Sequence, residues 1–122
     1  MPDSLLYIGE EAFAQAHKLA EVTWGKNIQT IGKHAFLYCD SLTDIILPNS
    51  ITNIEDGAFS GCSNLKTITI QSENPVIANN IFSGTSGLTI NVAWDEGAVP
   101  GAPWGGLFAK INYNYKVGNE SV

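Results

Sequence analysis

The sequence predicts an α/β solenoid, a fold in which short repeats stack along one axis. Phenylalanines recur every 23 residues, and an isoleucine column and a leucine column keep the same interval. A unit this short cannot bury its own apolar face and must stack on its neighbours. The members of the three columns are Phe13, Phe36, Phe59 and Phe82; Ile8, Ile31, Ile54 and Ile77; and Leu19, Leu42, Leu65 and Leu88.

The composition limits the classes of function. A length of 122 residues and a hydrophobic content of 44% suit a single domain with a continuous core, which we assign to residues 1–122. All six basic residues are lysines against twelve acidic residues, for a formal net charge of -6. Nucleic acid is therefore not expected as a partner, because the charge repels a polyanion and arginine is missing. Membrane insertion is not expected either, since no apolar run approaches the ~20 residues of a span.

Each unit changes its hydrophobic spacing partway along. An i, i+1, i+4 pattern, as at Ala35, Phe36 and Cys39, predicts a short helical turn. The alternating runs at 42–47 and 65–70 are rich in β-branched residues and predict strands of a parallel sheet. A second, shorter extended piece is expected before each helical turn, at 27–31 and 50–54 in the middle units.

The N-terminal end has no polar capping unit ahead of the first isoleucine column. Solenoid ends must be covered, so two interpretations stand: further repeats precede this segment in a longer array, or Leu5, Leu6 and Tyr7 fold over the end. The first four residues lack the basic start and apolar core of a signal peptide. An uncovered edge also predicts weak homodimer formation.

Residues 93–122 break the period and are rich in glycine, proline and tryptophan. We expect a loop that packs Trp104 over the last unit and then a closing strand, so that this segment forms a C-terminal cap after repeats that span about 5–92. The closing strand is indicated by alternate apolar residues, Ile111, Tyr113, Tyr115 and Val117. If Trp94 is partly exposed, its indole face offers an alternative role as a weak glycan-binding platform.

Two cysteines and two histidines are the residues most typical of a catalytic or metal site. Their positions in the repeat argue against such a site. Cys39 and Cys62 hold equivalent positions in adjacent units, which predicts parallel buried thiols and neither a disulfide nor a metal site. His17 and His34 lie at positions that other units fill with unrelated residues, so both are expected at the surface. No nucleophile, phosphate-loop or metal-ligand motif occurs, so we expect no enzyme activity, catalytic residue, cofactor or metal.

The outward face of the main predicted sheet is the remaining candidate for function. Alternate strand positions point away from the core, and most of them carry small polar side chains. Such a shallow surface suits an extended or convex protein partner better than a small molecule. The candidate protein-binding residues are Glu21, Thr23, Asp44, Ile46, Thr67, Thr69, Thr89 and Asn91. The alternative is a structural spacer or cap that has no ligand of its own.

Two consecutive units share a motif that resembles the BspA-like leucine-rich repeats of bacterial surface proteins. In the first of them it runs Ile31-Gly32-x-x-Ala35-Phe36-x-x-Cys39-x-x-Leu42-x-x-Ile45-x-Leu47-Pro48. The resemblance covers about residues 5–92 and weakens in the outer units, where Ala16 and Thr85 stand in place of the cysteine. It implies a curved leucine-rich-repeat solenoid, adhesion or protein binding that often involves host extracellular proteins, and a secreted or cell-surface location. It brings no catalytic residues.

Overall fold

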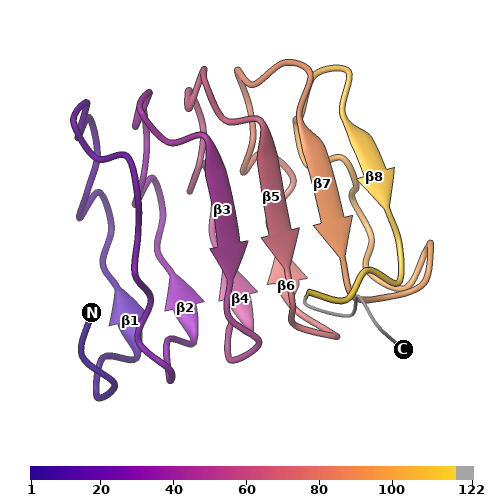
Figure 1. Ribbon diagram of the computed structural model, residues 1–122, viewed down its shortest axis with the longest axis horizontal. Coiled ribbons are helices and arrows are strands. Elements are labelled where there is room, and N and C mark those ends of the chain that lie inside the picture. Colours follow the sequence, from indigo (N-terminus) through magenta and orange to yellow (C-terminus); the bar gives the residue numbers. More distant parts are fainter. Residues whose placement is uncertain (118–122) are drawn as a thin grey trace.

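The computed structural model describes residues 1–117 and forms a parallel β-solenoid of about five circuits, which we call coils (Figure 1). The strands are β1 (Tyr7–Ile8), β2 (Thr30–Ile31), β3 (Asp44–Leu47), β4 (Asn53–Ile54), β5 (Thr67–Ile70), β6 (Val76–Ile77), β7 (Thr89–Val92) and β8 (Lys110–Asn112). They form a smaller sheet of order β1-β2-β4-β6 and a larger sheet of order β3-β5-β7-β8. We number the coils from residues 7, 30, 53, 76 and 98 onward.

The 23-residue register predicted from the columns holds throughout the smaller sheet and between β3 and β5 of the larger sheet. In the smaller sheet Ile8, Ile31, Ile54 and Ile77 pair in one ladder, with every strand parallel to the next. In the larger sheet Ile68 pairs with Ile90, so the fourth unit is one residue shorter than the 23-residue period. Because strands of adjacent coils lie side by side, each column becomes a line of similar side chains.

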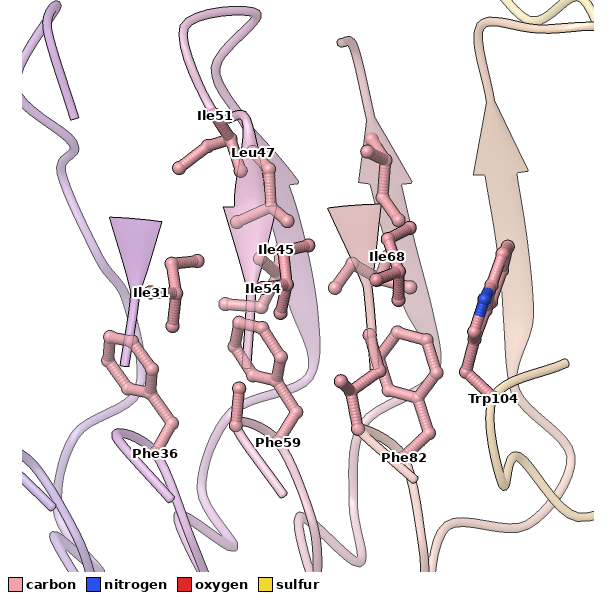
Figure 2. Packing of buried hydrophobic residues seen from close by; sticks show 14 of the residues in the cluster. Ile31, Phe36, Ile45, Leu47, Ile51, Ile54, Phe59, Ile68, Phe82 and Trp104 are labelled. Atoms are coloured by element: carbon pink, nitrogen blue, oxygen red, sulfur yellow. The ribbon is translucent and has the colours of Figure 1, made fainter. Parts of the chain in front are cut away.

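The phenylalanine column forms a stack of rings along the solenoid axis (Figure 2). The ring centroids lie 5.2 Å apart for Phe13 and Phe36, 5.3 Å for Phe36 and Phe59, and 6.2 Å for Phe59 and Phe82. The last three rings are fully buried, whereas Phe13 is 36% exposed. The core is therefore continuous through the middle coils and open at its N-terminal end.

The structure differs from the predicted fold class at the helical turns, because residues 1–117 contain no helix. These segments are successive tight turns in which a residue with positive φ recurs every fourth position, as at His34 (54°) and Tyr38 (58°). Alternate N–H groups donate to the next coil and not to their own. The Phe36 N–H, for example, donates to the Ala58 carbonyl at 2.8 Å. An α-helix would return each of these N–H groups to its own segment. The same apolar spacing therefore occurs here in a series of tight turns and not in a helix.

Glycine takes over the positive-φ positions in coil 3. Gly57 and Gly61 occupy the columns of His34 and Tyr38, with φ of 67° and 72°. The imidazole and phenol rings of coil 2 lie directly over these two glycines, where a Cβ would collide with them. This packing explains why glycine follows histidine in this column, at Gly57 of coil 3.

Residues 93–117 continue the stack without the regular repeat. β8 pairs with β7, and the fully buried Trp104 lies at the end of the ring stack beyond Phe82 (Figure 2). Its Nε1–H donates to the Pro100 carbonyl at 3.0 Å. The closing strand is shorter than predicted, since β8 ends at Asn112, and residues 118–122 of the predicted cap lie outside the described residues. None of the described chain forms a helix of the length and apolar character that crossing a membrane requires.

Candidate protein-binding face

Six of the eight predicted outward residues lie on strands of the larger sheet and pair in two rows. One row joins Asp44, Thr67 and Thr89, and the other joins Ile46, Thr69 and Asn91. β8 extends both rows, adding Lys110 and Asn112. Sequence reasoning missed these two residues, because the irregular fifth coil hides which of its positions align with the periodic ones.

The second row is closed by hydrogen bonds between side chains. The Asn112 amide donates to Asn91 Oδ1 at 2.8 Å, and the Asn91 amide donates to Thr69 Oγ1 at 3.2 Å. We call these three residues the polar ladder. Thr69 and Asn91 are each only 5% exposed, so they connect β5, β7 and β8 and present little surface to a partner.

The exposed apolar residue of the face lies in its N-terminal half. Ile46 is 50% exposed on β3, Asp44 is exposed on the same strand, and Glu21 and Thr23 are exposed one 23-residue period earlier. Glu21 and Thr23 belong to coil 1, in a segment that forms no strand. The face thus combines one exposed aliphatic side chain with two exposed carboxylates and small polar groups.

A hollow of about 410 Å³ lies on the side of the smaller sheet and was not expected from the sequence. Its lining includes three carboxylates, one lysine and the exposed Val76: Glu10, Lys33, Glu55, Asp56 and Val76. Among residues 1–117, no group of three or more histidine, cysteine or acidic side chains is arranged to hold a metal ion.

The two cysteines are buried free thiols in one column, as predicted. The Cys39 thiol donates to the Phe13 carbonyl at 3.0 Å, and the Cys62 thiol donates to the Phe36 carbonyl at 3.1 Å. Burial raises the pKa of both thiols, and that of Cys62 rises to about 12. Both sulfur atoms are therefore small core groups and not nucleophiles.

We expect neither thiol to react with Ellman's reagent in the folded protein at about pH 8, because only the thiolate attacks. Both should react at once in guanidinium chloride, and labelling of the native protein at the same rate would contradict the assignment. The raised pKa of Cys62 also means that the unfolded state ionises first. Its contribution to stability is complete below the ordinary pKa of 9.0 and is lost as the pH rises toward about 12, a loss that Cys62→Ala should abolish.

The histidines do not form a site. His17 is exposed and its Nδ1 lies 3.1 Å from Asp40 Oδ1, an interaction at the surface that contributes little to stability. His34 is half-buried over Gly57, as described above. The predicted surface position is confirmed for His17 and only in part for His34.

Trp94 does not offer a sugar-stacking surface, and the expectation that it is partly exposed is wrong. It is 4% exposed and packs edge-on against Trp104, with ring centroids 6.1 Å apart. The break in the period hid this contact, because Trp94 has no counterpart in the earlier units. Its Nε1 has no hydrogen-bond partner among the described residues.

These features of residues 1–117 define a repeat solenoid with two parallel sheets. A family model described as a BspA type leucine rich repeat region (6 copies) matches residues 1–95, and the chain belongs to this family. Leucine-rich repeat families are generally non-catalytic scaffolds for protein interaction, and repeats of the BspA type are typically found in surface proteins. No curated protein and no solved structure matches the chain significantly.

Proposed function

We propose that this chain is a protein-binding module that contacts its partner through the N-terminal half of the larger sheet's outer face. The observation that carries the proposal is the half-exposed Ile46, an apolar side chain on a paired strand within a polar surface. A side chain presented by a rigid strand loses little freedom on binding, so its burial can contribute to affinity. Of the predicted contact residues, Thr69 and Asn91 support this surface from within.

The surface around Ile46 indicates the kind of partner. Asp44 lies on the same strand and Glu21 holds the equivalent position of coil 1, with no basic residue in the same part of the two rows. A protein surface with an apolar centre and lysine or arginine at its rim would cover Ile46 and pair both carboxylates. On the basis of the family, we propose adhesion to a host extracellular protein, as part of a secreted or cell-surface bacterial protein.

The test compares two arginine substitutions on opposite sheets. Ile46→Arg should weaken binding to one or more members of a panel of purified extracellular matrix proteins by about tenfold or more, because it removes a central apolar contact. Val76→Arg is the matched control, since Val76 is 69% exposed on the smaller sheet. Surface plasmon resonance measures the affinities, and circular dichroism verifies the folding of both variants. Equal binding by both variants would refute the proposed face.

The second candidate function is a structural one, in which the chain closes one end of a longer stack and has no ligand of its own. The difference between the two ends favours it: Phe13 is 36% exposed at the N-terminal end, whereas Trp104 is fully buried beyond Phe82. On this proposal residues 1–122 act as one domain and 93–122 as its cap. Binding of none of the matrix proteins by the unaltered chain would favour this function over the first.

A further inference from the structure

The interface between coils is built from one repeating set of hydrogen bonds. Alternate N–H groups of each turn segment donate to carbonyls of the next coil that lie two residues apart. From coil 1 to coil 2 the donor and acceptor residues are Glu11 and Lys33, Phe13 and Ala35, and Gln15 and Leu37. From coil 2 to coil 3 they are His34 and Asp56, Phe36 and Ala58, and Tyr38 and Ser60. Each coil therefore accepts donors from the coil before it.

The N-terminal face of coil 1 carries the same acceptors without donors. The carbonyls of Glu10, Ala12 and Ala14 stand 23 residues ahead of the three in coil 2 and receive no hydrogen bond from the described residues. On the strand side, the carbonyls of Leu6 and Ile8 accept from coil 2. The N–H and C=O groups of Tyr7, which lies between them, must point the opposite way, toward the open face.

The apolar part of this face is equally incomplete. Phe13 ends the ring stack with one side uncovered, and Tyr7 is 50% exposed. A hollow of about 220 Å³ lies beside Phe13 and is also lined by Leu19 and Val22. One carboxylate and one threonine hydroxyl also line this hollow, so it is not wholly apolar.

The position of Met1 shows where a further coil would join. Met1 stands 23 residues ahead of Trp24 and 46 ahead of Leu47, in the column that ends each strand of the larger sheet. Its amino group donates to the Thr23 carbonyl at 3.0 Å. The pairing of β3 with β5 directs the Leu47 N–H to the carbonyl of Thr69 in the same way. Met1 thus already occupies the last strand position of a preceding coil.

We infer that the N-terminal face is a docking surface for one more coil of the same 23-residue repeat, joined ahead of Met1, with its phenylalanine stacked on Phe13. Such a coil presents turn N–H groups at the spacing of the three free carbonyls. A second copy of the chain fits less well, because a two-fold contact sets acceptor-rich faces against each other and leaves the carbonyls of Ala12 and Ala14 without donors. This inference does not depend on the proposed binding face.

The experiment adds a copy of residues 24–46, after an initiating methionine, directly before Met1 of the full chain. Amide hydrogen exchange at Tyr7 and Gly9 should slow markedly, because the added coil supplies acceptors for both N–H groups. Thr30 and Gly32 are the internal reference, since their N–H groups already donate to the Leu6 and Ile8 carbonyls. The thermal midpoint should rise by several degrees, and circular dichroism should show added β-structure.

A matched control carries Phe36→Asp in the copied segment only, which removes the ring that would stack on Phe13 while the length stays the same. This control should show neither the slower exchange nor the higher midpoint. The inference is overturned if both extensions behave as unstructured tails. It is also overturned if the unextended chain forms a concentration-dependent dimer in sedimentation that Phe13→Asp abolishes, because the face would then bind a second copy.

Discussion

Phe59→Ala is expected to lower the free energy of unfolding by roughly 3–5 kcal/mol, the range observed for removal of a large buried aromatic side chain. Phe59 is fully buried, and its ring stacks on Phe36 on one side and on Phe82 on the other. Its loss leaves a cavity that separates two halves of the ring stack. Because typical domains have a net stability of only ~5–15 kcal/mol, this single change should bring the protein close to unfolding.

Phe13→Ala is the matched control, since it removes the same side chain from the same column at the open end. Phe13 is 36% exposed and has a ring neighbour on one side only. We therefore expect a distinctly smaller loss, measured for both variants by urea unfolding followed by tryptophan fluorescence. Equal losses at the two positions would show that the ring stack is not the central element of stability.

Removal of residues 93–122 is expected to cause aggregation. The deletion takes away β8 and Trp104, and it exposes the apolar end of coil 4 together with the full edge of β7. An unpaired strand edge beside exposed apolar surface is a template for association with other chains. Light scattering during expression and refolding measures the effect.

Trp104→Ala separates the packing of the indole from the pairing of β8. We expect this variant to remain folded with a stability lowered by roughly 3–5 kcal/mol, because the buried indole and its hydrogen bond to the Pro100 carbonyl are both lost. A truncated protein that stays monomeric and unfolds at the same urea concentration as the full chain would contradict the capping role of this segment.

The periodic part of the fold could be predicted because each column repeats the same physical demand. Inward residues such as Ile45 and Ile68 keep their spacing wherever adjacent strands must align, so the register is visible in the sequence. The backbone between the strands was not predictable from apolar spacing, since a helix and a series of turns place the same residues inward. Gly57 and Gly61, four residues apart, were the available signal for positive φ. In coils 1 and 2 ordinary residues with side chains occupy these positions and hide it.

The sequence predicts which side of the sheet the candidate residues face, but it does not predict which of them are accessible. Alternation along β5 and β7 assigns Thr69 and Asn91 to the outer side, yet both residues are buried. Their burial depends on neighbours across the sheet, including Asn112, which belongs to a segment outside the repeat. The burial of Trp94 has the same cause, because its contact with Trp104 lies within that segment.

The polar ladder also has an electrostatic direction. Each amide donates toward the N-terminal side, from Asn112 to Asn91 and from Asn91 to Thr69, so the bond dipoles point the same way and strengthen one another. The series ends at Thr69, whose row partner Ile46 has no polar side-chain atom to accept from its hydroxyl. The aligned hydrogen-bond dipoles therefore end at the boundary between the buried polar ladder and the exposed Ile46. A partner that covers Ile46 would therefore border the polar ladder without binding it, since Thr69 is only 5% exposed.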